Sequence, residues 1–246
     1  MKKGFHYALL TAAILTLASC STTKYVPDGS YLLDEVRIHT DNKNVKPSNL
    51  SIYVRQNPNS KWFSLIKTQL YVYNWSGRDS TRWVNRALRR LGDAPVIYSK
   101  EETERSREEM TKAVQNMGYM GATVEYIPKI KKKKVKLAYK VNTGEPYIVR
   151  SLKYDVQDEK ICEYRQKDSA STYLSEGMYF NANILDSERQ RITGNLLRNG
   201  YYKFNKDYIS YTADTVRGTY QVDLTLHLAR YRQHSGAELQ DHPQYT

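Results

Sequence analysis

Alternating apolar and polar residues predict strands at several places along the chain. The clearest alternation lies in residues 135–141 and 220–228, where every second residue is apolar. This pattern is typical of a strand with one buried face. Shorter alternating segments follow two turn sequences, Pro27-Asp28-Gly29 and Gly144-Glu145-Pro146. We therefore expect small sheets, each with one face that other elements must cover.

Helical periodicity occupies the regions between these strands. Apolar residues recur at i, i+3, i+4 and i+7 in one helix: Met110, Ala113, Val114 and Met117. In a second helix, the matching places are occupied by Ile192, Leu196 and Asn199. Ser99 and Glu102 have the spacing of a capping box at the start of the first helix. Short helical stretches are expected near residues 47–56 and 159–167.

The chain contains an internal repeat. Asn116-Met117-Gly118-Tyr119 and Arg198-Asn199-Gly200-Tyr201 each follow a helix, and their Gly-Tyr pairs are 82 residues apart. We interpret Gly118 and Gly200 as left-handed residues that end the helices, and Tyr119 and Tyr201 as strand aromatics. These four residues specify the fold and need not touch a ligand. Each copy has the order strand, helix, helix, strand, strand.

The N-terminus has the features of an export signal. Lys2 and Lys3 precede an apolar stretch, residues 8–18, which is shorter than the ~20 residues of a membrane-spanning helix but fits a signal peptide. Leu17-Ala18-Ser19-Cys20 resembles the lipobox of bacterial lipoproteins. That resemblance implies cleavage before Cys20 and three acyl chains on Cys20, enough for stable membrane anchoring. An ordinary signal peptide with a chance cysteine is the alternative.

A second resemblance covers residues 27–230. Gly-Glu-Pro-Tyr-Ile-Val at 144–149 precedes a strand, and Leu-Leu-Arg-Asn-Gly-Tyr-Tyr-Lys-Phe at 196–204 ends a helix. This arrangement resembles a polypeptide-transport-associated (POTRA) domain of the BamA and TamA superfamily of outer-membrane assembly proteins. With the lipobox, it resembles the lipidated TamA-like proteins of the Bacteroides group. The resemblance implies an α+β fold of two tandem β-α-α-β-β domains, each a small mixed sheet covered by two helices.

This reading divides the chain into five parts. A signal peptide (1–19) and a lipidated tether (20–26) precede a first domain (27–143) and a second domain (144–230). Residues 231–246 form a polar linker. Its last residues, His-Pro-Gln-Tyr-Thr, echo the Glu-Pro-Tyr-Ile that opens the second domain, so we interpret them as the truncated start of a third unit and hypothesise that the sequence is a fragment.

The first domain carries an aromatic and basic insertion near residues 57–91. Within it, residues 81–91 predict an amphipathic helix capped by Asp79 or Ser80. Such a helix can lie on an anionic membrane or dock a partner, or it can pack over the sheet of its own domain. The candidate contact residues are Trp83, Arg86, Arg89 and Arg90.

Positive charge is concentrated in one short segment. The chain has 38 basic and 26 acidic residues, a net charge of +12, which becomes +10 after removal of the signal peptide. Six lysines lie between residues 129 and 136, at an expected hairpin tip. The candidate membrane or partner contacts among them are Lys131, Lys132, Lys133 and Lys134. Plain solvation of the tip is the alternative, whereas export argues against nucleic acid as a partner.

No catalytic, metal-binding or cofactor-binding pattern is apparent. The five histidines are scattered, and His227, within a predicted strand, is interpreted as a sheet histidine with satisfied hydrogen bonds. Cys162 has no nearby histidine in the sequence and is interpreted as a half-buried thiol. We therefore expect a non-enzymatic protein without cofactor or metal.

The POTRA resemblance implies a role in the cell envelope. Its expected partners are an outer-membrane β-barrel, either a missing C-terminal part or a separate protein, unfolded outer-membrane protein clients, and the membrane through the lipid anchor. We expect outer-membrane anchoring, with the domains facing the periplasm. Clients can add a strand at open sheet edges, for which residues 119–127 and 201–211 are the candidates. The alternative is a stand-alone envelope lipoprotein that serves as a scaffold for a folded partner or the membrane surface.

Overall fold

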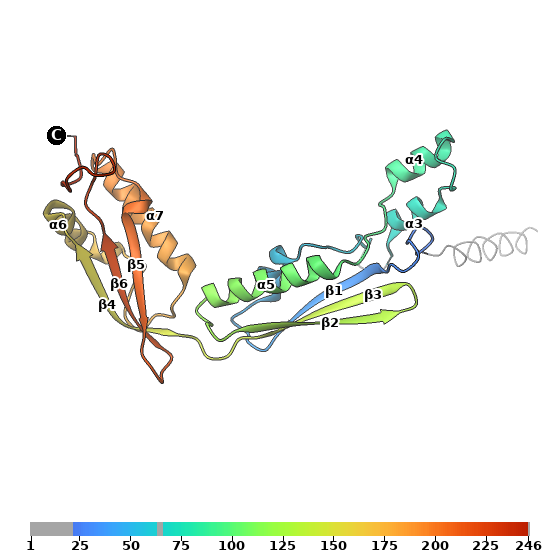
Figure 1. Cartoon of the computed structure of the whole chain (residues 1–246), viewed down its shortest axis with the longest axis horizontal. Coiled ribbons are helices and arrows are strands. Elements are labelled where there is room, and N and C mark those ends of the chain that lie inside the picture. Colours follow the sequence, from blue (N-terminus) through green and yellow to red (C-terminus); the bar gives the residue numbers. More distant parts are fainter. Residues whose placement is uncertain (1–21, 63–65, 246) are drawn as a thin grey trace, which may run out of the picture. The chain divides into compact units, whose positions relative to one another are not determined.

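The structure is a computed structural model that describes residues 22–62 and 66–245, and the chain divides into two compact units (Figure 1). The first unit comprises Met1–Met110 and Val124–Val141, and the second comprises Thr111–Thr123 and Asn142–Thr246. Each unit contains one three-stranded sheet. The predicted signal peptide and Cys20 lie outside the described residues.

The first sheet has the strand order β1-β3-β2. Strand β1 (Leu32–Thr40) pairs in parallel with β3 (Lys134–Asn142), and β3 follows β2 (Thr123–Lys131) through the two-residue turn Lys132-Lys133. The register shifts between Leu33 and Glu35. The alternating residues of β3 are buried as the sequence predicts: Val135, Leu137, Tyr139 and Val141.

The helices of the first sequence repeat start with α2 (Pro47–Leu50), which continues into the 3₁₀ turn η1 (Ser51–Tyr53). Helix α5 (Lys100–Asn116) lies along one face of the sheet (Figure 1). The Ser99 side chain accepts a hydrogen bond from the Glu102 amide (3.2 Å), which is half of the predicted capping box. The Ser99 amide, however, donates to the Gln56 side chain at 2.9 Å instead of to Glu102.

The insertion forms a helical pair, α3 (Thr68–Trp75) and α4 (Trp83–Leu91). Helix α4 lies beside α3, and none of its residues is buried. It therefore does not cover the sheet of its own unit. The predicted cap was wrong: α4 starts at Trp83, after the uncapped Arg82, because the Asp79 carboxylate instead holds a turn ahead of the helix by accepting from the amide and hydroxyl of Thr81.

The second sheet repeats the topology of the first, with the order β4-β6-β5. Strand β4 (Ile148–Val156) is parallel to β6 (Gln221–Leu228), and β5 (Ile209–Thr215) is antiparallel to β6. A register shift between Val149 and Ser151 corresponds to the one in β1. The two mixed sheets and their helices confirm the predicted α+β class and the tandem arrangement.

Two helices cover the second sheet and supply its core. Helix α6 (Glu159–Lys167) precedes the 3₁₀ turn η2 (Ser169–Ser171), and α7 (Ala182–Arg198) precedes η3 (Lys206–Tyr208). The α6 N-cap, Asp158, accepts a hydrogen bond from the Ile161 amide at 3.1 Å. The core joins one face of β6 to both helices: Val222, Leu224, Leu226, Leu228, Ile161, Leu185, Ile192 and Leu196.

The segment after α7 differs from the sequence expectation. A strand was expected to start at Tyr201, but β5 starts at Ile209. Gly200 has a φ of +88°, and the Tyr201 amide donates back to the Leu196 carbonyl at 3.1 Å, which closes the helix end. The chain then forms a loop instead of the expected strand. Tyr201 and Phe204 of this loop are buried in the core.

Candidate functional site

Each sheet has one edge that the chain covers in part. The Leu33 amide of β1 donates to the Val96 carbonyl at 2.8 Å, so the segment before α5 occupies the start of this edge. In the second unit, the Val149 amide of β4 donates to the Met178 carbonyl at 2.9 Å, and the Gly177 amide donates to the Val149 carbonyl at 2.8 Å. The same edge is therefore blunted in both units.

The opposite edges, β2 and β5, remain open. Among the described residues, strand β2 pairs only with β3, and β5 pairs only with β6. In residues 22–62 and 66–245, no backbone segment pairs with the outer side of either strand. Both candidate edges from the sequence overlap these strands, although β2 starts at Thr123 and β5 at Ile209. Pro128 lies within β2 and removes one donor from it.

The solvent side of the second sheet carries a hydrogen-bonded row across its three strands. The His227 ring in β6 donates from Nδ1 to Asp155 of β4 and bonds through Nε2 to the Thr212 hydroxyl of β5, both at 2.9 Å. The hydrogen bonds of the imidazole are thus satisfied within the sheet, as the sequence predicts. This row fixes β5 from its inner side and leaves its outer edge open.

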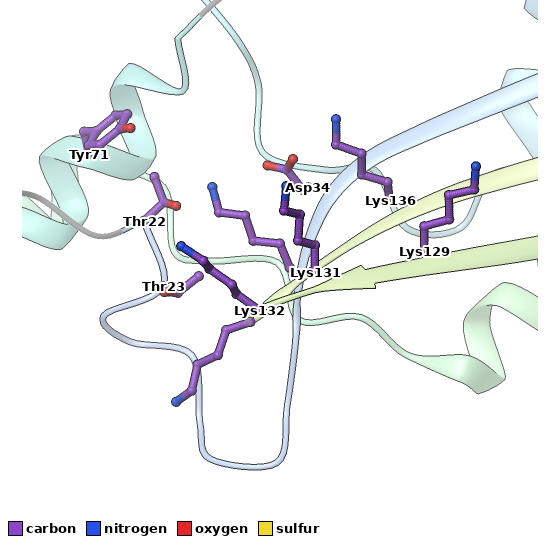
Figure 2. A pocket seen from close by; sticks show the side chains of 10 residues that line it. Thr22, Thr23, Asp34, Tyr71, Lys129, Lys131, Lys132 and Lys136 are labelled. Atoms are coloured by element: carbon purple, nitrogen blue, oxygen red, sulfur yellow. The ribbon is translucent and has the colours of Figure 1, made fainter. Parts of the chain in front are cut away.

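A basic pocket of about 590 Å³ lies at the tip of the β2–β3 hairpin. Figure 2 shows lysine side chains gathered at this tip, with Thr22, Thr23 and Tyr71 on the other side of the pocket. Asp34 is the one carboxylate among the lining residues. All six lysines of the segment contribute to the lining: Lys129, Lys131, Lys132, Lys133, Lys134 and Lys136.

Two of these lysines have carboxylate partners. Lys133 contacts Asp28 at 2.8 Å, and Lys136 contacts Glu35 at 3.1 Å. The hydrogen bond from Lys133 lowers the pKa of Asp28, and hydrogen bonds from Arg37 and Lys136 lower the pKa of Glu35. The other four lysines have no ion-pair partner among the described residues: Lys129, Lys131, Lys132 and Lys134.

The carboxylate of the pocket is already engaged. Lys67, whose side chain is only 6% exposed, contacts the Asp34 carboxylate at 3.2 Å and donates to the Asp34 carbonyl at 2.7 Å. Burial lowers the pKa of Lys67, although Asp34 opposes this effect. Because Asp34 balances Lys67, it does not neutralise the lysines of the hairpin.

Helix α4 contains the other candidate contact residues. Trp83 is 74% exposed and Leu91 is 72% exposed, and Arg86 and Arg90 are also exposed. Arg89 has a different role, because it donates to the Ser76 hydroxyl at 3.2 Å and to the Gly77 carbonyl at 2.9 Å. Arg89 therefore stabilises the fold through internal hydrogen bonds, whereas Trp83, Arg86 and Arg90 are exposed on the surface.

The two Gly-Tyr turns share one geometry. Gly118 and Gly200 have φ values of +98° and +88°, and Tyr119 and Tyr201 are buried. A side chain at Gly118 would meet the Phe180 carbonyl oxygen at 2.0 Å. These residues do not line the basic pocket.

Sequence reasoning missed two buried polar groups of the second unit. His242, expected in a polar tail, is 5% exposed, and its amide donates to Asp158 at 2.8 Å. Glu188 of α7 is 1% exposed and bonds to Arg191 and Thr172 at 2.8 and 2.7 Å. The Glu-to-Arg spacing of three residues on a helix was a visible signal for the second group. No local signal linked residues 158 and 242.

Among the described residues, no group of three or more His, Cys, Asp or Glu side chains could hold a metal ion. Cys162 is a half-buried free thiol. Within residues 22–62 and 66–245, no helix has the length and apolar character needed to cross a membrane.

Sequence comparison identifies a family for part of the chain. Residues 31–144, somewhat less than half of the sequence, match the family model named POTRA and described as "Surface antigen variable number repeat". The second unit repeats the strand order of the first. Residues 31–144 therefore match a POTRA domain, and the second unit has the same strand order. Comparison with curated proteins finds no match.

Comparison with solved structures finds similar chains at low sequence identity. BamA from Haemophilus ducreyi lacking POTRA domains 1-3 has 17% identity and a TM-score of 0.37, covering 80% of this chain and 29% of that chain. POTRA3-5 of Haemophilus influenzae BamA has 14% identity and a TM-score of 0.34, with 83% and 99% covered. POTRA1-2 of Omp85 from Anabaena has 13% identity and a TM-score of 0.34, with 82% and 98% covered. The chain spans less than a third of the Haemophilus ducreyi protein.

Proposed function

We propose that this protein is the non-enzymatic POTRA module of an outer-membrane protein assembly or translocation factor. Its two units receive extended client segments at the open edges β2 and β5, beside an insertion barrel that belongs to the same polypeptide or to a separate protein. The observation that supports this proposal most is the asymmetry of both sheets. In each, the chain itself blunts one edge, and no described residue pairs with the other.

Strand addition gives this arrangement a physical mechanism. An open edge presents backbone N–H and C=O groups that pair with any extended segment, so affinity comes from the backbone and depends little on client sequence. An unfolded barrel protein offers many alternating segments of this kind. Two edges in one chain can hold two segments of one client, and the second contact is then intramolecular.

We further propose the envelope address and the division of the chain predicted from its sequence. Residues 1–19 act as a lipoprotein signal peptide, Cys20 carries the acyl chains, and the domains 27–143 and 144–230 face the periplasm. The basic start, the apolar core and the small residues before Cys20 support this address. Mass spectrometry of the N-terminal peptide tests it: a free Cys20 thiol on the mature protein would refute lipidation.

The test of strand addition uses the alternation of hydrogen bonds along β5. In an antiparallel pair, the N–H of one residue points to the partner strand and the N–H of the next points away. Of the neighbours Thr212 and Ala213, one therefore faces β6 and the other faces the open side. Proline at the inward position removes a ladder bond, whereas proline at the outward position leaves the fold intact.

Each of the two single variants, Thr212→Pro and Ala213→Pro, thus serves as the control for the other. Circular dichroism and urea denaturation identify the variant with native stability, and that variant is then mixed with an unfolded outer-membrane barrel protein. We expect this well-folded variant to lose most of its crosslinks to the client. Unchanged crosslinking by the well-folded variant would refute strand addition at β5.

A second candidate function is a stand-alone scaffold that docks a folded partner. It is favoured by the exposed apolar side chains of α4, Trp83 and Leu91, beside exposed arginines. Recovery of the native complex with an antibody to the protein, before and after the change Trp83→Ser with Leu91→Ser, distinguishes the two candidates. A scaffold would lose its folded partner in this variant, whereas a client receptor would keep its unfolded clients.

A further inference from the structure

The basic pocket contains more positive charge than the fold neutralises. Four of its lysines have no ion-pair partner among the described residues, and the lining carboxylate, Asp34, is bound to Lys67. Like charges placed this closely repel one another, which opposes formation of the hairpin tip. An anion with several oxygens bound in the pocket would remove this repulsion.

The backbone conformation at the hairpin tip is unfavourable for lysine. Lys132 has a φ of +54°, in the left-handed region that glycine and asparagine occupy at lower cost. A two-residue hairpin turn favours those residues at this position. The chain instead keeps a lysine there, with its side chain at the pocket (Figure 2).

Residues that line the far side of the pocket are close in sequence to the proposed membrane anchor, Cys20. Thr22 and Thr23 line the pocket together with Tyr71 of α3. Cys20 precedes Thr22 by two residues, and two residues of extended chain span at most about 7 Å. Acyl chains on Cys20 would therefore enter a bilayer within one short tether of the lysines.

We propose that this pocket binds the phosphate headgroups of the membrane in which Cys20 is anchored. This inference rests on the proposed lipidation, because the anchor selects lipid-borne phosphate over free phosphate by holding the lysines at the headgroup surface. Lysine binds phosphate as a point charge from a flexible stem, which suits headgroups that move. The pocket and the anchor then act as two linked contacts that orient the first unit on the membrane.

The test uses the mature chain, residues 20–246, with Cys20→Ser so that no lipid contributes to binding. It is floated with phosphatidylcholine vesicles with and without phosphatidylglycerol. We expect binding only to the vesicles with phosphatidylglycerol. Each lysine near an anionic surface strengthens binding about fivefold. Replacing the four unpaired lysines by glutamine should therefore weaken binding about six hundredfold. The four-residue variant is Lys129→Gln, Lys131→Gln, Lys132→Gln and Lys134→Gln.

A matched control removes the same charge from exposed lysines outside the pocket: Lys43→Gln, Lys112→Gln, Lys160→Gln and Lys167→Gln. We expect this control to keep most of the vesicle binding. Equal losses in the two variants would overturn the pocket and leave net charge as the cause. Binding of inorganic phosphate in solution, without any binding to vesicles, would overturn the lipid source.

A final measurement separates this inference from the proposed function. Strand β5 (Ile209–Thr215) contains none of the four lysines, so we expect client crosslinking at β5 by the four-lysine variant in detergent to remain unchanged. Loss of vesicle binding with retained crosslinking supports the pocket. Vesicle binding by the four-lysine variant equal to that of the parent chain overturns the pocket, whatever the client result.

Discussion

The Tyr245 amide donates to the carbonyl oxygen of Gly200 at 2.9 Å. The Tyr147 amide makes the same bond to Gly118, also at 2.9 Å, so both Gly-Tyr turns receive a tyrosine from a segment that contains a proline. Tyr245 also stacks on Tyr202, with ring centroids 4.1 Å apart. This repeated bond gives a structural reason for the sequence echo between residues 145–148 and 242–245.

Alanine at Gly200 should destabilise the second unit. Gly200 has a φ of +88°, and a new Cβ would lie 3.1 Å from the Tyr245 carbonyl oxygen, so we expect a loss of about 1–2 kcal/mol. Gly194 is the control, because it lies inside α7 with only the end of Arg198 nearby, and alanine there should stabilise by about 0.5–1 kcal/mol. Urea denaturation of the two variants should give changes of opposite sign.

The buried carboxylate of Glu188 should make stability depend on acid pH. Burial acts to raise the pKa of Glu188, but hydrogen bonds from Arg191, the Tyr173 amide and Thr172 outweigh it and leave the pKa below its usual value. A lowered folded-state pKa means that the stabilisation is present above the unfolded value of about 4.3 and is lost as pH falls through the folded value.

The matching substitution is Glu188→Ala, which leaves the half-buried Arg191 with Asp168 as its remaining ion-pair partner and should cost about 3 kcal/mol. Glu163→Ala, on the exposed side of α6, is the control and should change stability by less than about 0.5 kcal/mol. Thermal unfolding between neutral and acid pH checks both. A Glu188→Ala variant whose unfolding keeps the pH dependence of the parent chain would contradict the assignment.

Glycine at Lys132 should stabilise the hairpin tip. Lys132 is the one non-glycine residue with positive φ among the described residues, and a left-handed φ costs an L-residue about 1–2 kcal/mol. We expect Lys132→Gly to recover about 1 kcal/mol, offset in part by the flexibility of glycine in the unfolded chain. Lys131→Gly, within β2, should destabilise instead. Urea midpoints that move in the same direction for both variants would contradict this account.

The arginines of α4 should separate into structural and surface residues. Arg89 bonds to Ser76 and Gly77 and lies 5.4 Å from the Tyr25 ring centre, so Arg89→Ala should cost about 1–3 kcal/mol. Arg90 is exposed, and Arg90→Ala should change stability by less than about 0.5 kcal/mol. Thermal unfolding checks this pair, and equal losses would refute the division.

Most parts of the fold that were predicted correctly depend on local sequence patterns. The alternation in β3 and β6 and the left-handed Gly118 and Gly200 depend on neighbours within a few residues, so they were visible in the sequence. The start of β5 was not, because Tyr201 and Phe204 resemble strand residues until the turn at Gly200 directs them into the core. The start of α4 at Trp83 was missed because an aspartate such as Asp79 can either cap a helix or stabilise a turn ahead of it, and here it stabilises the turn.

Contacts between distant residues could not be predicted. His242 bonds to Asp158 across 84 positions of sequence, and neither residue carries a local sign of the other. The lysine segment was visible as charge, but its role depends on Thr22, Asp34 and Tyr71, which only the folded chain brings to the same pocket. The predicted edges overlap the open edges only in residues 123–127 and 209–211, and the loops that blunt β1 and β4 were not predicted.

Hydrogen exchange of the mature chain, with and without an unfolded outer-membrane barrel protein, tests the central claim most directly. If clients add strands at the open edges, outward amides in β2 and β5 become slower to exchange when the client is added, and the amides of the central strands β3 and β6 do not change. Protection confined to α4, or no protection in β2 and β5 at client concentrations that saturate binding, would contradict strand addition.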